Sequence, residues 1–502
     1  MPKKGIAKKA SIKSSKKNPA KKRKFYITTS IAYANGAPHI GHALEAVQAD
    51  AIARYRRSLG DEVFFSTGID EHGDKVNRVA QASGITAKIF VDDISSKFKD
   101  LKKALSLSWD GFIRTSDKKK HWPGAYKIFK KLEDAGDIYK KEYKGLYCVG
   151  CEKFLTEKDL EDGKCPLHKK EPEEVAEENY FFRLSRYAGK INEAISKGKL
   201  KILPEIRKNE VMSFLSEGLE DISFSRAAKS VPWGIPIKGT DQTMYVWCDA
   251  LSNYVSAVGY GRDETMFSHW WPADVHLIGK DIYRFHALFW PAMLMSAKLP
   301  LPKNLYIHGF VSIDGQKMSK SLGNVIDPFE IAKKYGTDAI RHYFLREIPS
   351  DGDGDYSEKK LVQRYNDDLA KGIGNFASRI TNLSNGISVS SRFEPSPKIK
   401  KEIVRAEKRI AKHMAEFRIH DAMNALMDLM KFGDGYINEK QPWKNRDQKV
   451  LKELVVILRE FNRMLSPFLP DAAKKIAKGI TEDKGTIKVK KLKPIFPRIE
   501  NK

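Results

Sequence analysis

The chain has 502 residues, of which 41% are hydrophobic and 31% charged, which is typical of a globular protein with room for about three domains. No apolar run approaches the ~20 residues that a helix needs to cross a bilayer, so a helical membrane span is excluded. The net charge of +26 favours an extended polyanion as partner, although a generally lysine-rich composition would give the same value.

Residues 1–24 form the first segment and contain ten Lys, one Arg and no acid. Little in this segment can pack, so we expect it to be a disordered basic tail. It lacks the apolar core of a secretory signal, and a cytoplasmic location is expected. Two interpretations stay open: an arm that binds RNA non-specifically, or a solubilising extension. Without the tail's charges the chain still carries +15 (26 − 11), so its body is basic too.

The first predicted strand, Phe25–Thr29, leads through a turn-rich stretch into a helix that is expected to run to Gly60. The helix opens on the histidine motif, Pro38-His39-Ile40-Gly41-His42. A strand, a tight loop and a helix N-terminus form the place where a Rossmann-like sheet receives phosphate, because free N–H groups and the helix dipole face the anion. The two histidines lie three residues apart and project from one face. They could simply cap the helix, but their spacing favours phosphate contact.

A second strand is predicted at Val63–Thr67, and a cysteine cluster follows further along the chain. Cys148-x-x-Cys151 and Cys165-x-x-His168 are two short pairs separated by 13 residues. This spacing predicts one structural Zn²⁺ rather than a disulfide, because such pairs supply the four ligands of a closed tetrahedron. The less common alternative is a group of reduced, buried cysteines. The fourth cysteine, Cys248, is expected to be an ordinary buried thiol.

These patterns predict an α/β fold: a Rossmann-like parallel-sheet catalytic domain, split by a zinc-binding insertion and followed by a helical bundle. The expected segments are 25–116 (first half of the catalytic domain), 117–230 (insertion), 231–330 (second half, with strands at 275–278 and 305–308), 331–366 (linking segment) and 367–502 (helical domain). Within the last segment we expect helices at 368–383, 402–413 and 451–469, and an inter-helix loop at 386–398. Beyond residue 331 no further strand is evident until the very end.

The lysine motif, Lys317-Met318-Ser319-Lys320-Ser321, lies between Gly315 and Gly323 and contains two ammonium groups. We expect it to form a mobile loop that closes over triphosphate. Paired lysines are commonly only a solvated charge run. The histidine motif, 275 residues earlier (317 − 42), favours chemistry instead: attack of a carboxylate on the α-phosphate of ATP. Such a reaction needs positioning and charge stabilisation rather than an acid–base residue.

Together with Gly68–Gly73, Tyr245–Ala250, Ile278–Ile282 and Phe285-His286, the two motifs resemble class I aminoacyl-tRNA synthetases, and within that class the methionine-specific branch. The resemblance runs from about Phe25 to the C-terminus. It implies activation of L-methionine with ATP to methionyl-adenylate and pyrophosphate, then transfer to the 3′ end of tRNA(Met), including the initiator tRNA. It also implies Mg²⁺ with ATP and a structural zinc; relatives carry one or two zinc ions, and this sequence supplies ligands for one.

The resemblance implies a role for each matching residue. The catalytic residues would be His39, His42, Lys317 and Lys320, the last of which would stabilise the departing pyrophosphate. Contacts to ATP would come from Gly41, Asp249, Lys280, Ser319 and Ser321, with Asp249 binding the ribose or ordering a loop. The methionine site would consist of Ile31, Tyr33, Asp70, Trp247, Ala250, Leu251, Tyr254, Ile282 and His286. Asn375, Arg379 and Trp443 would read the CAU anticodon.

Three of these roles need a comment. Asp70 would grip the methionine ammonium, and Tyr254 or His286 would offer a weak hydrogen-bond donor to the sulfur. Leu251 stands where some relatives have Pro, so the pocket floor would differ in shape.

The alternatives are another class I synthetase, a nucleotidyltransferase of the same superfamily, and an RNA-binding protein with degenerate motifs. The valine, isoleucine and leucine enzymes carry a longer insertion, and a nucleotidyltransferase would lack the helical last third. Both ATP motifs are intact here, which argues against degeneracy. Because the chain ends soon after Pro497, we expect no added tRNA-binding module and a monomer.

Overall fold

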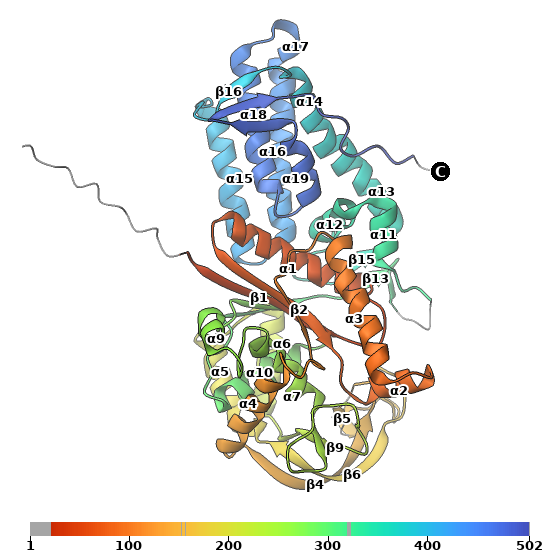
Figure 1. The fold of residues 1–502 in the computed structure, drawn as a ribbon. Coiled ribbons are helices and arrows are strands. Elements are labelled where there is room, and N and C mark those ends of the chain that lie inside the picture. The colour runs from red at the N-terminus through yellow and green to blue at the C-terminus, as the bar shows by residue number, and fades with distance from the viewer. Residues whose placement is uncertain (1–21, 152, 156, 319–322, 501–502) are drawn as a thin grey trace, which may run out of the picture.

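A six-stranded parallel sheet forms the centre of the computed structural model, which describes residues 22–151, 153–155, 157–318 and 323–500 (Figure 1). The strand order is β3-β2-β1-β11-β12-β7. The bounds are β1 Lys24–Tyr33, β2 Glu62–Asp70, β3 Gly111–Arg114, β7 Lys201–Leu203, β11 Val275–Gly279 and β12 Asn304–His308. The order reverses between β1 and β11, and in such sheets the crevice at the carboxyl ends of the strands at this point receives ligands.

Helix α1, Ile40–Ser58, packs on β1 and β2 and ends two residues before the predicted limit. Apolar residues at helical spacing, among them Leu44, Val47 and Ile52, are buried against the sheet. Arg56 and Arg57 lie in the last turn, where positive charge complements the helix dipole. The first half of the domain also contains α2 Asp74–Ala82 and α3 Ala87–Ala104.

A four-stranded sheet of order β5-β4-β6-β8 lies at the far end of the molecule from the helical bundle (Figure 1). Its strands are β4 Ile138–Cys148, β5 Lys153–Leu155, β6 Glu173–Phe182 and β8 Ile222–Ser223. Neighbouring elements are α4 Trp122–Asp134, α5 Ala188–Ser196, α6 Glu205–Glu217 and the β9–β10 pair, Ser225–Ala227 and Gln242–Met244. The chain returns to the central sheet before residue 230, because β7 pairs with β12.

The second half of the sheet domain is mostly helical between its strands. It contains α7 Val246–Leu251, α8 Asn253–Ser256, α9 Glu264–Trp270, a π-helix at Phe285–Phe289 and α10 Trp290–Ser296. A small sheet of order β14-β13-β15 follows: β13 Val311–Ile313, β14 Gln316–Lys317 and β15 Gly354–Tyr356.

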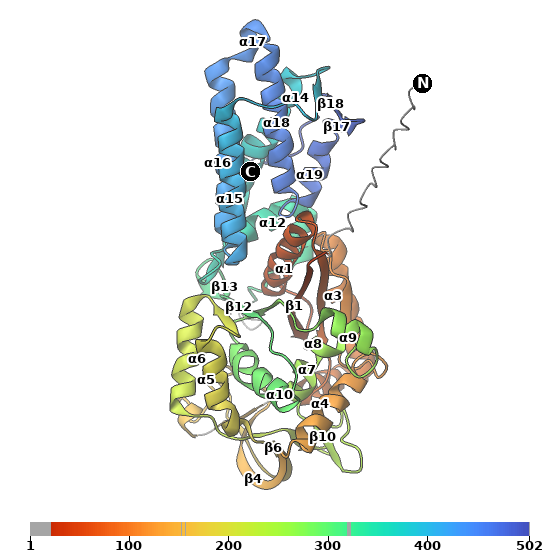
Figure 2. The same ribbon diagram turned by 90° about the vertical axis from the view of Figure 1, so that its left-hand side faces the viewer.

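The C-terminal third is a helical bundle in which α15 and α16 run side by side, with α12 at their base next to α1 (Figure 2). Its elements are α11 Pro328–Tyr335, α12 Thr337–Arg346, α13 Glu358–Arg364, a π-helix Tyr365–Gly374, α14 Asn375–Leu383, α15 Pro397–Ala415, α16 Ile419–Lys440, α17 Pro442–Asn445, α18 Gln448–Leu465 and α19 Pro470–Ala477. Among the described residues, no helix is both long enough and apolar enough to span a membrane.

Four details of this third differ from the sequence-based expectation. The 22-residue α16 was not predicted. The expected loop at 386–398 contains β16, Ser388–Ser390, which forms a small sheet with β17 Ile480–Asp483 and β18 Thr486–Val489, and β15 is a further unpredicted strand. The helix expected at 451–469 ends at Leu465, four residues early.

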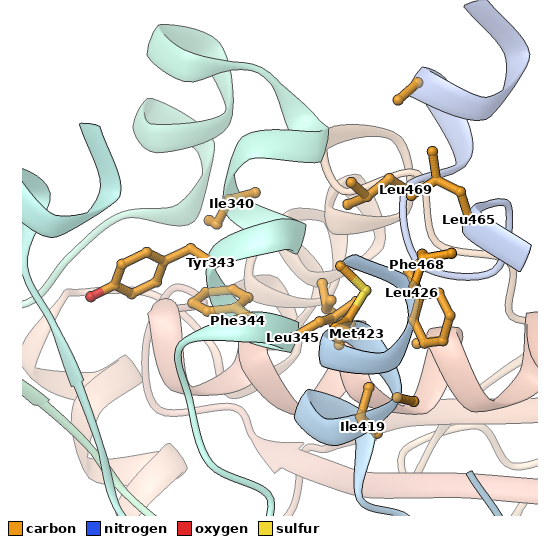
Figure 3. Packing of buried hydrophobic residues seen from close by; sticks show 14 of the residues in the cluster. Ile340, Tyr343, Phe344, Leu345, Ile419, Met423, Leu426, Leu465, Phe468 and Leu469 are labelled. Atoms are coloured by element: carbon orange, nitrogen blue, oxygen red, sulfur yellow. The ribbon is translucent and has the colours of Figure 1, made fainter. Parts of the chain in front are cut away.

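The bundle and the sheet domain share one continuous apolar core. Ile340, Phe344 and Leu345 of α12 pack against Met423 and Leu426 of α16 and the α18–α19 turn (Figure 3). The buried Arg341 joins the same junction: its guanidinium pairs with Asp50 of α1 at 2.8 Å and donates to the Phe468 carbonyl at 2.8 Å. The two parts therefore meet through packing and through buried polar contacts.

Candidate active site and metal site

The histidine motif lies directly after β1, at the switch point of the sheet. His39 is the N-cap of α1: its Nδ1 accepts from the Gly41 amide at 3.2 Å, and His42 Nδ1 accepts from the His39 amide at 3.2 Å. The two rings stack with centroids 3.8 Å apart. Because each Nδ1 is an acceptor here, the hydrogen of each neutral ring lies on Nε2. Capping thus fixes which ring nitrogen can donate to a ligand.

The lysine motif meets the histidine motif across this helix N-terminus. A methyl group placed on Gly41 would lie 3.9 Å from Met318 Cε, and the Ile40 amide donates to the Ile326 carbonyl at 3.1 Å. A hairpin presents Lys317: β13 and β14 are joined by a turn with Asp314 and Gly315 at φ of 47° and 78°. Ser319, Lys320 and Ser321 lie outside the described residues. The described residues on either side, Met318 and Ile326, both lie at the start of α1.

The strands next to the switch point contribute charged groups at the same edge. His308, at the end of β12, pairs with Glu45 of α1 at 3.0 Å, and its other nitrogen faces the Gly309 carbonyl at 2.8 Å. Burial opposes protonation of His308, but the contact with Glu45 outweighs it and raises its pKa. Asp281 follows β11, and desolvation by the surrounding protein raises its pKa. Sequence reasoning missed these three residues, although Asp281 adjoins the predicted Lys280.

Two residues predicted to bind ATP are engaged with other protein groups. Lys280 Nζ contacts both oxygens of Asp353, at 2.6 and 2.7 Å, and lies over the Phe310 ring. Asp249 is buried, and each of its oxygens takes one imidazole, from His72 and from His121, at 2.6 Å. This geometry favours the loop-ordering role of Asp249 over a ribose contact, because both oxygens are occupied.

Two of the residues predicted to bind methionine, Tyr254 and His286, form a hydrogen-bonded pair. Tyr254 and His286 are buried, and their hydroxyl and Nε2 lie 2.6 Å apart. Burial lowers the pKa of His286 to about 4, so the ring is neutral. Its Nδ1–H donates to the Ile282 carbonyl at 2.9 Å, and Nε2 therefore accepts from Tyr254. In this arrangement both hydrogens are used within the protein, and the predicted weak donor to a substrate sulfur stays a prediction.

Most of the other residues predicted to bind methionine lie on α7, β1 and β2. Trp247 stacks on Phe285 with centroids 3.6 Å apart, and its ring is nearly perpendicular to that of His286 in a T-shaped contact. Ala250 and Leu251 are buried in the same short helix, α7. Ile31 and Tyr33 are among the last three residues of strand β1, and Asp70 ends β2 beside Tyr33 in the sheet register. The π-helix carrying His286 inserts an extra residue per turn, a feature that often occurs at functional sites.

The four predicted zinc ligands come together in the β4–β6 region. The ligand atoms of Cys148, Cys151, Cys165 and His168 all lie within 4.8 Å of one another. Sulfur–nitrogen distances are 3.3–3.8 Å and one sulfur–sulfur distance is 3.6 Å. Zn–S and Zn–N bonds of tetrahedral zinc imply edges of about 3.5–3.8 Å, so the donor set fits the ion. Gly150 is required here, because an added methyl would lie 2.5 Å from the His168 ring.

The three predicted anticodon residues lie in the helical bundle. Asn375 is exposed at the start of α14, and Arg379, one turn further on, donates to Asp434 at 3.1 Å and to Asn438 at 2.9 Å. Trp443 is half exposed in α17, which lies at the end of the bundle distant from the central sheet (Figure 1). Left-handed residues at Gln441 and Arg446 flank α17 and turn the chain sharply around this tryptophan.

Comparisons with known proteins agree with this arrangement. A family model described as "tRNA synthetases class I (M)" matches residues 25–172 and 155–381, and one for the anticodon-binding domain of tRNA ligase matches 398–499. The methionine--tRNA ligase of Clostridium acetobutylicum is 41% identical, over 96% of this chain and 79% of the relative. That of Brucella suis is 41% identical, over 91% of both chains.

Solved structures give the same result. Mycobacterium tuberculosis methionyl-tRNA synthetase in complex with methionyl-adenylate superposes with a TM-score of 0.88 at 36% identity, covering 95% of this chain and all of the other. The apo form of that enzyme gives 0.82 at 32% identity, covering 96% of this chain and 99% of the other.

A doubly wound parallel sheet with a histidine and a lysine motif at its switch point, joined to a helical bundle, defines a class I aminoacyl-tRNA synthetase. The predicted fold class is confirmed. Within that class, the chain belongs to the methionine--tRNA ligase family.

Proposed function

We propose that this protein activates L-methionine with ATP and transfers the methionyl group to the 3′ end of tRNA(Met). The observation that carries the proposal is the meeting of the two nucleotide motifs, with Met318 against Gly41 and Ile326 bonded to Ile40. Their chain positions are far apart, and one bound triphosphate would use both of them at this helix N-terminus. The methionine--tRNA ligase names of relatives at about 41% identity support the choice of amino acid.

In the first step, the methionine carboxylate attacks the α-phosphate of ATP and pyrophosphate leaves. The carboxylate is already a nucleophile, so no general base is needed, and catalysis consists of positioning and charge stabilisation. The Nε2–H groups of His39 and His42 donate to phosphate oxygens at the α1 N-terminus as charge develops. Lys317 and Lys320 stabilise the departing pyrophosphate, with Gly41, Ser319 and Ser321 as further ATP contacts. Mg²⁺ enters with ATP as part of the substrate.

Methionine binds between two groups of residues. Asp70 pairs with its ammonium, and Trp247, Ala250, Leu251, Tyr254, Ile282 and His286, with Ile31 and Tyr33, surround its side chain. The Tyr254–His286 hydrogen bond supports this proposal, because it fixes two aromatic rings that a thioether can contact. It also leaves no strong donor exposed to the sulfur. In the second step, a ribose hydroxyl at the tRNA 3′ end attacks the adenylate carbonyl and AMP leaves.

The helical bundle reads the anticodon in this proposal. Arg379 and Asn375 supply base-edge hydrogen bonds, and Trp443 supplies a stacking face for a splayed base. The half-exposed position of Trp443 at the distal end of the bundle supports this role, because its ring is accessible to a base. Initiator and elongator tRNA(Met) share the CAU anticodon, so both are substrates in this proposal.

The Cys148, Cys151, Cys165 and His168 cluster holds one structural Zn²⁺. A closed Cys₃His set leaves no open position for substrate, so the ion would stabilise the fold of the insertion rather than take part in the reaction. We further propose a cytoplasmic monomer. Most of the large exposed apolar side chains among the described residues lie on separate elements, which does not favour an extensive subunit interface.

ATP–pyrophosphate exchange with each of the twenty amino acids tests the activity. Exchange with methionine at least about a hundredfold above any other natural amino acid is expected, because the pocket must select a flexible thioether. No exchange with methionine, or a preference for another amino acid, would reject the proposal. Aminoacylation of tRNA(Met) transcripts with CAU and altered anticodons separates the second step from the first.

A further inference from the structure

A buried carboxylate with an imidazole on each oxygen lies beneath the proposed methionine site. Asp249 Oδ2 contacts His72 Nδ1, and Oδ1 contacts His121 Nε2, both at 2.6 Å. The three side chains are 1%, 3% and 0% exposed, respectively. Burial alone would raise the pKa of Asp249, but the two imidazoles outweigh it and lower the pKa, so the group is a carboxylate.

The three residues come from three separate parts of the chain. His72 follows Asp70 by two residues, in the turn after β2. Asp249 belongs to α7, the short helix that also carries Trp247 and Ala250. His121 precedes α4, at the start of the predicted insertion. One carboxylate therefore ties together the two segments proposed to bind the opposite ends of methionine.

The turn that follows Asp70 is held by several hydrogen bonds next to this contact. The Glu71 amide donates to Thr115 at 2.9 Å, and its carboxylate accepts from Arg114 at 2.7 Å. The Trp233 indole donates to the Glu71 carbonyl, and the Gly73 amide donates to the Trp233 carbonyl at 3.0 Å. These contacts fix residues 71–73, and the His72–Asp249 contact joins this segment to α7.

We propose that Asp249, with His72 and His121, positions Asp70 and α7 at the separation that lets one methionine reach both. This inference rests on the proposed function, because the roles of Asp70 and Trp247 are part of it. These residues do not touch the reacting atoms. They are positioning residues, and their contribution is the pre-organisation of two binding half-sites.

A carboxylate is needed because it accepts two hydrogen bonds and donates none. The Nδ1 of His121 is buried and has no partner among the described residues, so the hydrogen of the neutral ring lies on Nε2 and is committed to Asp249. An amide at position 249 offers a single acceptor and turns its NH₂ toward one imidazole N–H. Asp249→Asn therefore breaks one contact while keeping the size of the side chain.

The test is a double-mutant cycle measured by methionine binding, followed through tryptophan fluorescence, with ATP affinity and melting temperature recorded for each variant. Asp249→Asn should weaken methionine binding about tenfold and ATP binding less than twofold. In an Asp70→Asn background the same change should weaken methionine binding less than about threefold, because one half-site is already lost. The positioning role would be overturned if Asp249→Asn weakened methionine binding by the same factor in both backgrounds. Equal losses of ATP and methionine affinity would also overturn it.

A second pair of variants guards against a folding defect in Asp249→Asn. His121→Gln keeps an N–H donor for Asp249, and its methionine affinity should stay within about threefold of wild type. His121→Leu has no donor and should lose about tenfold in methionine affinity, as expected for Asp249→Asn. Equal affinities for the two variants would overturn the proposal. If Asp70→Asn alone left methionine binding unchanged, the assignment of the ammonium site would be wrong. If the wild type bound no methionine, the proposed function itself would fail.

Discussion

In the proposed function, His39 and His42 each serve two purposes at the start of α1. Their Nδ1 atoms cap the helix, and capping places the hydrogen of each neutral ring on Nε2. The structural and the chemical interpretation of these histidines are therefore compatible. Three residues of spacing put both rings in one stack, and this arrangement follows directly from helix geometry, so it was predictable from the sequence.

Other residues of the site were not predictable, because their role depends on contacts between distant segments. His121 has no local motif, and only the fold brings it to Asp249. Glu45 and His308 form a pair across 263 residues of chain. Glu45 lies in a helix, His308 ends a strand and His121 precedes a helix, and nothing in the neighbouring sequence marks any of them as part of a site.

Tyr254→Phe tests the aromatic pair at the residue scale. The change leaves the neutral His286 Nε2 without its donor, and we expect methionine affinity to fall about tenfold while ATP affinity changes less than twofold. Fluorescence titration with each ligand measures both affinities. Tyr306→Phe is the control, because this buried hydroxyl donates to the Ser350 carbonyl away from the site. Unchanged methionine affinity in Tyr254→Phe, or an equal loss in the control, would contradict the assigned role.

At the scale of elements, long apolar runs predicted strands correctly, whereas short strands and one helix that contains glycines were not predicted. The strands at β1, β2, β11 and β12 have apolar runs bounded by turns, and each was found where expected. Strand β7 is only three residues long, and pairing with β12 rather than its own sequence makes it a strand. The strands β15 to β18 are similarly short. Helix α16 was missed because it contains two glycines, Gly433 and Gly435, which are poor helix formers and suggest a loop.

Gly150→Ala tests the zinc knuckle as an element. The added methyl would lie 2.5 Å from the His168 ring and would displace this ligand, so we expect zinc affinity to fall at least about tenfold. Competition with a chromophoric chelator measures the affinity. Gly189→Ala in α5 is the matched control, since nothing lies within 4 Å of the added methyl. Equal zinc affinities for both variants would show that Gly150 is not needed to seat His168.

At the scale of the whole molecule, α12 links the sheet domain to the bundle. Its apolar face packs on α16 and the α18–α19 turn (Figure 3), and its Arg341 reaches Asp50 of α1. Asp338, in the first turn of α12, accepts from the Ala472 amide of α19. The orientation of the bundle toward the histidine motif therefore depends on a few buried polar groups within a shared core.

The Asp338 carboxyl gives this junction a pH dependence. Burial, opposed in part by Arg341, raises its pKa to about 6 from an ordinary value of 3.8. The folded state therefore favours the protonated form. The contribution of Asp338 to stability is present at low pH and is lost as the pH rises from about 4 through 6.

Asp338→Asn mimics the protonated form and still offers a carbonyl oxygen to Ala472. We expect the variant to be more stable than wild type, with an advantage that grows by roughly 1 kcal/mol between pH 5 and pH 7 and then levels off. Denaturant unfolding at several pH values measures it. Asp93→Asn, at an exposed position on α3, should show no such trend. A constant or falling advantage for Asp338→Asn would contradict the assigned burial cost.

Lys320→Ala, followed by rapid-quench measurement of methionyl-adenylate formation, tests the central claim most directly: that the histidine and lysine motifs act together on one bound ATP. The rate of adenylate formation should fall at least about a hundredfold, while the dissociation constant for methionine stays within about threefold. A parallel loss of rate and methionine affinity, or no loss of rate, would contradict the account.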